Sequence, residues 1–334
     1  MSKLEPQNSQ AVAEINGLQS NPLYTWLKRN LASIIALLIM VAILTFSTNS
    51  FMVSTNLISV LRQVCVNCFI AFGITCVLIC GGIDLSVGSV VAAAGVIAVR
   101  MANAGVPVIF AVLTALAFGA LLGLFNGYII SHTTIPPFIV TLSTQIIIRG
   151  VSYLLTDGLP AQCTNEAFNN IGTGSILDIP IPVIIVAFTL LVLYFVMGRS
   201  AFGRHVYATG GNIEAAKYAG VNTRSVQMRV FMMSGILAAL AGVVLAARLY
   251  SGQPSVGEGF ERDAIAASVL GGTSFNGGIG TLGGTVVGVL IIGVLNNGMN
   301  LLKINSYWQF VVKGIVILGA VYIDYMKKRK SLKK

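Results

Sequence analysis

The sequence predicts an all-α polytopic membrane protein with about ten transmembrane helices and both termini in the cytoplasm. Of its 334 residues, 55% are hydrophobic and 10% are charged, and the mean hydropathy is +0.85. Soluble domains carry roughly a quarter of their residues as Asp, Glu, Lys or Arg, so lipid must surround most of this chain. Ten crossings of about 20 residues use roughly 200 residues, which leaves no room for a large soluble domain. The first apolar run, from about Leu31, is long for a signal-peptide core and is expected to be a retained span.

Uncharged stretches define the expected crossings. Residues 107–148 and 264–302 lack charge, and each stretch is too long for one membrane helix and long enough for two. The chain is therefore expected to divide into a cytoplasmic N-terminal tail (1–29), a transmembrane domain (30–325) and a basic cytoplasmic C-terminal tail (326–334). The expected helices are centred near residues 39, 70, 93, 118, 147, 189, 239, 270, 292 and 315, and the eighth is glycine-rich.

Loop charge gives the expected orientation. The loop at 199–229 holds five basic residues and one acidic residue, whereas the loops around 156–178 and 251–263 together hold six acidic residues and one basic residue. Because basic loops remain in the cytoplasm, the first loop is expected inside and the other two outside. Basic residues in the expected outer half, such as Arg149 and Lys313, weaken this pattern, and snorkelling to lipid headgroups accounts for some of them.

The net charge of +10 reflects membrane orientation rather than nucleic-acid binding. Six of the 21 basic residues fall in the last eight positions, directly after the last apolar run. Basic residues that flank apolar spans fix orientation in a membrane. No nucleic-acid partner is therefore expected.

The loop at 199–229 contains a short capped helix in the prediction. Asn212 follows a Gly-Gly break and can cap the helix, and Glu214 lies in the first turn, where a carboxylate suits the helix dipole. Gly220 is placed to end the helix. Two helical turns with few apolar residues are marginal in water unless something packs on them. This segment is either an ordinary connector or a docking element for a cytoplasmic partner.

Asp84 is the one acidic residue inside the first five expected spans. An ionised carboxylate at membrane depth is costly, which makes Asp84 a functional candidate. Gly81-Gly82 breaks the preceding helix, so Asp84 can also cap the next helix and satisfy N–H groups that lipid would leave unpaired. The cap is the preferred interpretation, and a role in gating is the second.

Several motifs, in order along the chain, resemble those of the permeases of ABC importers. Residues 214–220 (EAAKYAG) are similar to the EAA-then-glycine coupling motif of that family, and residues 81–89 (GGIDLSVGS) to the signature of its sugar-type branch. Residues 136–142 (PPFIVTL), Arg149-Gly150 and the glycine-rich run 271–284 extend the resemblance, which covers about 30–325. The sequence thus resembles the ribose/xylose/arabinose/galactoside branch, and its ribose importers above all.

The resemblance implies the transmembrane subunit of an ATP-driven importer of a monosaccharide, with ribose as the expected sugar. It also implies a homodimer in the cytoplasmic (inner) membrane of a bacterium, an ABC-type ATPase subunit below it and an extracytoplasmic sugar-binding protein above it. ATP and Mg²⁺ would be bound by the ATPase, so this chain is expected to be no enzyme and to bind no cofactor. The ATPase-coupling role falls by position on Asn212, Glu214, Ala215, Ala216 and Gly220.

A polar path through the membrane is the second candidate site. Hydroxyl and amide side chains at broken helices can hydrogen-bond a polar solute such as a sugar, although the same groups could equally bond neighbouring helices. An aromatic residue at such a break could stack on a sugar, but packing is its commoner role. The candidate residues for the path or its gate are Asp84, Ser86, Asn126, Phe138, Thr141 and Asn297.

Other functions have less support. Catalytic sets, zinc spacings and Walker-type nucleotide motifs are absent from the sequence, so no catalytic or metal residues are expected. Four of the five cysteines lie near one apolar helix without a His or an acid beside them, where cysteine behaves as a small hydrophobe. The alternative function is a self-sufficient ion-coupled sugar carrier. Such a carrier would need intramembrane acids, and Asp84 is the one available in the first half.

Overall fold

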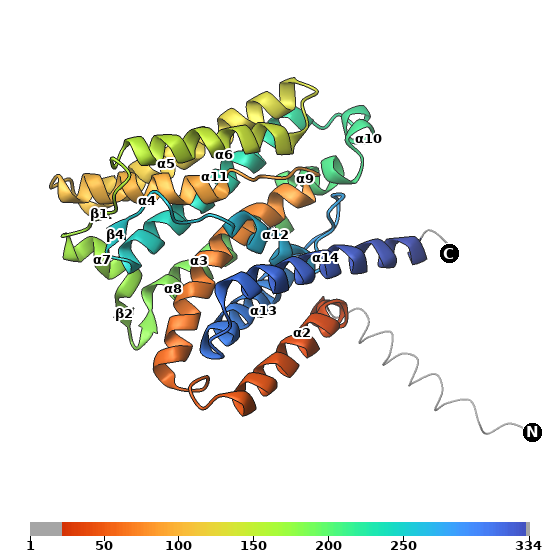
Figure 1. Ribbon diagram of the computed structural model, residues 1–334. Helices are drawn as coiled ribbons and strands as arrows, with labels where there is room; N and C mark the ends of the chain where they lie inside the picture. The colour runs from red at the N-terminus through yellow and green to blue at the C-terminus, as the bar shows by residue number, and fades with distance from the viewer. Residues whose placement is uncertain (1–21, 332–334) are drawn as a thin grey trace, which may run out of the picture.

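Helices make up most of residues 22–331, the part of the chain that the computed structural model describes (Figure 1). Four two-residue strands form two antiparallel pairs, β1 with β4 and β2 with β3. The strands are β1 (Ala161–Gln162), β2 (Ser175–Ile176), β3 (Ile179–Pro180) and β4 (Ser251–Gly252). The helices are α2 (Pro22–Ser47), α3 (Ser54–Ile79), α4 (Val87–Asn103), α5 (Val108–His132), α6 (Pro137–Leu154), α7 (Glu166–Thr173), α8 (Ile181–Gly198), α9 (Ala201–Gly211), α10 (Ile213–Tyr218), α11 (Thr223–Arg248), α12 (Phe260–Leu270), α13 (Leu282–Leu301) and α14 (Ser306–Ser331).

Seven of the described helices are long and apolar enough to cross a membrane, namely α2, α3, α5, α6, α8, α11 and α13. The all-α polytopic fold is therefore confirmed. Helix α4 and the first part of α14 are apolar but shorter. Helix α2 begins at Pro22, ahead of its apolar window Asn30–Ser47. Residues 1–21 and 332–334 of the expected tails lie outside the described residues.

The eighth expected helix, near residue 270, does not cross the bundle. Helix α12 has 11 residues, which at 1.5 Å per residue is about 17 Å, or roughly half of the hydrocarbon thickness. It ends because Gly271 is followed by Gly272 at a φ of 84°, a left-handed conformation that stops a helix. The glycine-rich sequence that weakened the helical pattern thus marks a break inside the bundle.

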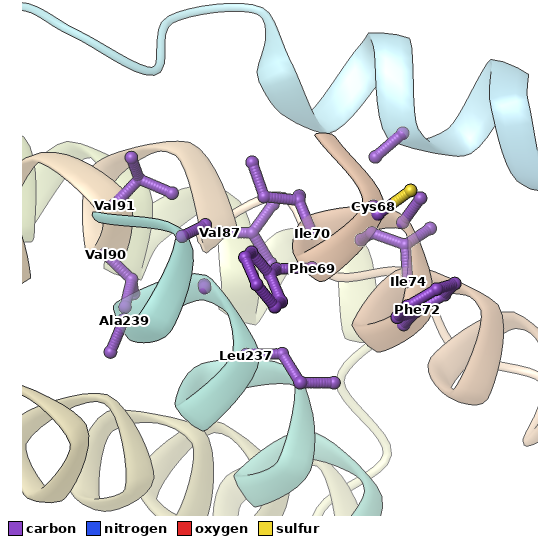
Figure 2. Close-up of a cluster of buried hydrophobic side chains, with 14 of the residues drawn as sticks. Cys68, Phe69, Ile70, Phe72, Ile74, Val87, Val90, Val91, Leu237 and Ala239 are labelled. Atoms are coloured by element: carbon purple, nitrogen blue, oxygen red, sulfur yellow. The ribbon is translucent and has the colours of Figure 1, made fainter. Parts of the chain in front are cut away.

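Helix α11 lies at the centre of the bundle. In its most apolar window 78% of the residues are buried, against 22% for α5 and for α8. Figure 2 shows Phe69 of α3, Val90 of α4 and Leu237 of α11 in one cluster of buried side chains. A central helix that is covered on all sides can carry polar residues only where the neighbouring helices bond them.

Small residues bring α5 and α11 into close contact. A Cβ added at Gly119 would overlap the carbonyl oxygen of Gly235, and one added at Gly123 would overlap that of Phe231. The four-residue spacing of these glycines therefore serves helix packing. It holds α5 directly against the centre of the bundle.

The loops separate into two ends of the bundle. The pairing of Ala161 with Gly252 joins the two acidic loops, which lie with α7 at one end (Figure 1). The first residues of α2, the last residues of α14 and α10 lie at the other end. The described chain ends thus share a side with the basic loop 199–229, and the acidic loops lie opposite. We call these the α10 end and the α7 end.

Two glycine-rich segments, residues 80–86 and 271–281, precede α4 and α13 and meet near the α10 end. The N–H of Gly278 donates to the carbonyl oxygen of Ile79 at 2.9 Å. Gly210, near the end of α9, lies against both segments, since a Cβ there would overlap the Ile79 oxygen and lie 2.9 Å from the Gly278 nitrogen. We call this three-way contact the glycine junction. It connects α9 to the two breaks in the bundle.

Candidate coupling helix and intramembrane polar network

The predicted capped helix forms as α10. The Asn212 side chain accepts a hydrogen bond from the N–H of Ala215 at 3.0 Å and so caps the first turn. Gly220 ends the helix at a φ of 82°, and its N–H donates to the Lys217 carbonyl at 2.9 Å. The expected local structure at Asn212 and Gly220 is therefore confirmed.

Most of α10 projects away from the bundle. Ala216 is buried and anchors the helix, whereas Glu214, Ala215 and Gly220 are exposed. Tyr218, which lies inside the EAA-type motif but was not among the predicted coupling residues, is 91% exposed. Exposed aromatic residues on a projecting element are typical of interaction hot spots. The shape and exposure of α10 suit a helix that docks into another protein.

Helix α9 attaches α10 to the bundle. It was missed from the sequence, although Ser200 caps it by accepting from the N–H of Gly203 at 3.1 Å, a signal that can be read from the sequence. Its Tyr207 hydroxyl donates to the Gly280 carbonyl at 2.9 Å. Because α9 also ends at the glycine junction, α10 is mechanically joined to both glycine-rich segments.

Asp84 is buried in the segment between α3 and α4. Its Oδ1 accepts from the backbone N–H of Ser86 at 3.0 Å and from the Ser86 hydroxyl at 2.6 Å, and its Oδ2 accepts from the Ser234 hydroxyl at 2.7 Å. The N-cap of α4 is Ser86, two positions later. The expected side-chain cap of α4 by Asp84 is therefore wrong, because the carboxylate lies too early in the chain to reach the N–H groups of the first turn. It fixes residues 80–86 to α11 instead.

Further polar side chains extend these contacts to α5 and α6. The amide of Asn126 donates to the Ser86 hydroxyl at 3.1 Å, and the Thr144 hydroxyl donates to Asn126 Oδ1 at 2.6 Å. The Thr141 hydroxyl lies 3.2 Å from the Ile83 carbonyl. We call Asp84, Ser86, Asn126, Thr141, Thr144 and Ser234 the intramembrane polar network, and every member is buried.

The network contains four of the six residues expected along a path, and the other two lie elsewhere. Phe138 lies in the first turn of α6 and is 47% exposed. Asn297 of α13 donates to Asn56 of α3 at 2.8 Å and accepts from its amide at 3.2 Å. The candidates therefore do not form one continuous lining within a single chain. Asp84, Ser86, Asn126 and Thr141 instead join helices in the packed interior.

Charged residues at and just before the start of α12, which were expected in an outer loop, lie beside basic residues of α6 and α14. Arg149 of α6 donates from Nη1 to the carbonyls of Pro254 and Val256 at 2.6 and 2.7 Å. Lys313 of α14 pairs with Asp263 of α12 at 2.8 Å. Snorkelling to headgroups is therefore the wrong explanation for Arg149 and Lys313, because both side chains bind partners within the bundle.

The cysteines lie where the sequence predicts. Cys65, Cys68, Cys76 and Cys80 are buried free thiols on α3 and directly after it, and Cys163 is a buried free thiol near β1. Within residues 22–331, no group of three His, Cys, Asp or Glu side chains is arranged to hold a metal ion.

Comparisons with known proteins place the sequence in a family. Residues 56–321 match the family described as branched-chain amino acid transport system / permease component. The chain is 44% identical over 301 residues to the ribose import permease protein RbsC of Bacillus subtilis, covering 90% of this chain and 94% of the relative. It is 39% identical over 290 residues to the D-allose transport system permease protein AlsC of Escherichia coli, covering 86% and 89%. It is 32% identical over 368 residues to the xylose transport system permease protein XylH of Escherichia coli, covering 90% and 94%.

No solved structure matches the chain. The chain is an integral membrane protein that belongs to this family of transport-system permease components.

Proposed function

We propose that the chain is the transmembrane subunit of an ATP-driven importer of a monosaccharide, with ribose as the expected sugar. The observation that carries this proposal is α10, a capped helix of six residues that projects from a chain whose relatives are named as ribose, allose and xylose permeases. A helix of this length is unstable on its own in water. Its exposed Tyr218 and Glu214 suit a cytoplasmic partner, and an ABC-type ATPase subunit is that partner in this proposal.

The orientation of the proposed importer follows from loop charge. Basic loops remain in the cytoplasm, so the α10 end and the described chain ends face the cytoplasm of a bacterium. The α7 end, where the acidic loops pair through β1 and β4, faces outward and receives sugar from a binding protein. A second copy of the chain completes the path. ATP and Mg²⁺ are bound by the ATPase, and this chain supplies the docking helix.

The glycine junction is the proposed route by which docking reaches the membrane. When the ATPase moves α10, α9 moves with it, and Gly210 lies directly against residues 80–86 and 271–281. Close backbone contact transmits displacement because packed interiors have little free volume. The movement therefore arrives next to Asp84, whose hydrogen bonds hold residues 80–86 to α11.

The intramembrane polar network is proposed to position the gate rather than to line an open path. Its residues are buried and bonded to one another, so a passing sugar would meet them only after the helices separate. Asn297 is assigned to the path by its polarity and position. Phe138, which is exposed at the start of α6, is assigned to it by its position and its aromatic ring. Asn212, Glu214, Ala215, Ala216 and Gly220 are assigned to ATPase coupling.

The test is uptake of labelled ribose into vesicles that contain the chain and its candidate ATPase, with the binding protein outside. One set encloses ATP, and another receives only an imposed ion gradient. We expect uptake that requires enclosed ATP. Uptake by the chain alone on a gradient would instead support the ion-coupled carrier, with Asp84 as the leading ion site.

A further inference from the structure

A cavity of about 190 Å³ lies between the start of α12 and the outer part of α14. We call it the outer cavity. An engineered cavity of about 150 Å³ in another protein admits a benzene ring, so this one has room for a molecule the size of a monosaccharide. The side chains that give it its chemistry are Glu258, Phe260, Arg262, Asp263, Phe310 and Lys313.

The outer cavity lies inside the level of the bundle rather than in the loops. Lys313 is seven residues after Ser306, the first residue of α14, which at 1.5 Å per residue is about 10 Å along the helix. Asp263 lies 3.5 Å from the amide of Asn296, and Asn296 precedes the end of α13 at Leu301 by about 8 Å. Both members of the ion pair are therefore at the depth of apolar helices.

Charge at this depth indicates that the cavity faces water. The lipid-exposed helices α5 and α8 carry no Asp, Glu, Lys or Arg between Val108 and His132 or between Ile181 and Gly198. Beside the cavity, in contrast, Glu258 and Arg262 are exposed. A charged side chain within the hydrocarbon costs about 2.5–3.5 kcal/mol at the centre of a membrane helix. This face of the molecule therefore borders an aqueous space and not lipid.

The lining combines the groups that a sugar requires. Carboxylates accept hydrogen bonds from hydroxyls, and guanidinium and ammonium groups donate to them. Asp263 uses Oδ2 for both Lys313 and Asn296, and within residues 22–331 its Oδ1 has no hydrogen-bond partner. Phe260 and Phe310 offer apolar faces to the C–H side of a sugar ring. Pockets with apolar walls and a few convergent polar groups are typical of small-molecule sites.

We propose that the outer cavity is a monosaccharide-binding site at which the sugar pauses after it leaves the binding protein and before it passes the gate. This inference rests on the proposed import function. It assigns a substrate role to Asp263, Lys313 and Phe310, none of which belongs to the coupling helix or the intramembrane polar network.

Glycines of α14 allow a test that leaves the lining side chains intact. Gly314 lines the cavity, and a Cβ added there meets nothing within 4 Å. Gly319 lies five residues further along the same helix, outside the cavity lining, and a Cβ added there also meets nothing within 4 Å. Gly314→Leu therefore adds an apolar side chain at the cavity wall from a position where a Cβ has free space, and Gly319→Leu is the matched control for folding and helix propensity.

The first measurement detects occupancy without ATP. The purified full chain with Gly314→Cys, in lipid nanodiscs, is treated with a water-soluble maleimide, because the five native cysteines are buried. We expect labelling, and we expect ribose at ten times its Kd to slow labelling about tenfold. Gly319→Cys should show no ribose protection. Absence of labelling, equal protection of both cysteines, or protection by leucine but not by ribose would overturn the proposal.

The second measurement separates this proposal from the function on which it rests. In vesicles that contain the complete transporter, wild-type uptake of ribose on enclosed ATP tests the importer itself. Gly314→Leu should lower that uptake about tenfold or more, since excess volume in a small pocket costs this much, while Gly319→Leu should not. If wild-type uptake is normal and the two variants take up ribose at equal rates, the outer cavity is not a sugar site. The proposed import function would be unaffected by that result.

Discussion

Two ion pairs of similar length lie in opposite halves of the molecule, in different surroundings. On α10, Lys217 and Glu214 approach to 2.9 Å with side chains 49% and 64% exposed. Between α14 and α12, Lys313 and Asp263 approach to 2.8 Å with side chains 26% and 13% exposed. Water screens the first pair, so it contributes little to stability. Neither member of the second pair can be removed without leaving the other charge poorly solvated.

The comparison shows what the same chemistry does at each end. Charge on α10 is not needed to hold the fold and remains available to a partner. Charge at α12 is held inside the bundle by specific contacts, which fixes the walls of the outer cavity. Asp84 is the most buried of the three carboxylates, at 1% exposed. It is bonded to serine hydroxyls and a backbone N–H rather than to a cation. The effect of replacing each carboxylate or its partner should therefore increase with burial.

Asp84→Leu should have the largest effect on stability. Leucine leaves the hydroxyls of Ser86 and Ser234 and the Ser86 N–H without an acceptor, and each buried unpaired group costs about 1–3 kcal/mol. We expect a loss of about 3 kcal/mol or more, measured as the apparent melting temperature in detergent. Asp84→Asn should lose far less, because its carbonyl oxygen still accepts from Ser86 and its amide can donate to the Ser234 hydroxyl.

The asparagine variant also tests the mechanism. If Asp84→Asn melts like the wild type yet transports no better than Asp84→Leu, then the charge itself is required. That result would support the hypothesis of an ion-coupled carrier. Near-normal ATP-dependent uptake by Asp84→Asn would instead rule that hypothesis out.

Lys313→Met should have the next largest effect. It leaves Asp263 without its cation, and breaking a fully buried pair costs about 3–5 kcal/mol. The partial exposure of Lys313 allows some solvation, so we expect about 2 kcal/mol, again from the apparent melting temperature. Lys303→Met is the control, because Lys303 is an exposed lysine between α13 and α14 and should melt like the wild type. Equal melting of the two variants would show that the pair contributes nothing to the fold.

Sequence reasoning succeeded where the signals were local. Asn212 and Gly220 act within a few residues of their own positions, so the cap and the stop of α10 could be predicted from residue type and spacing. The apolar stretches likewise predicted the helices because their length is set by the membrane. Helix α9 was missed even though its cap, Ser200, was visible.

The interior contacts could not be predicted because they join distant parts of the chain. Asp84 binds Ser234, 150 residues later, and Lys313 binds Asp263, 50 residues earlier. An acidic residue within an apolar stretch marked Asp84 as unusual. Its partner Ser234 could not be predicted, because that contact depends on how α11 packs against residues 80–86. The acidic residues at 258–263 were expected in an outer loop, and the sequence pattern did not show that Glu261 and Asp263 lie in the first turn of α12.

Glu214→Arg should have the smallest effect on stability and a large effect on transport. The lost pair with Lys217 is exposed, so unfolding should change by less than about 1 kcal/mol. If α10 docks into an ATPase, a reversed charge on its first turn should reduce co-purification of the ATPase and lower ATP-dependent uptake about tenfold or more, because mismatched charge at an interface costs several kcal/mol.

Glu166→Arg provides the matched control for this change. Glu166 is also exposed in the first turn of a short helix capped by an asparagine, since the Asn165 side chain accepts from the N–H of Phe168. It lies on α7, at the end of the bundle opposite α10 (Figure 1). Both variants place a cation in the first turn of a short helix, at opposite ends of the bundle. Glu214→Arg also loses the exposed pair with Lys217, which contributes little to stability. Loss of ATPase co-purification in Glu214→Arg alone supports docking at α10, whereas normal ATPase binding and uptake in Glu214→Arg would mean that α10 is only a connector.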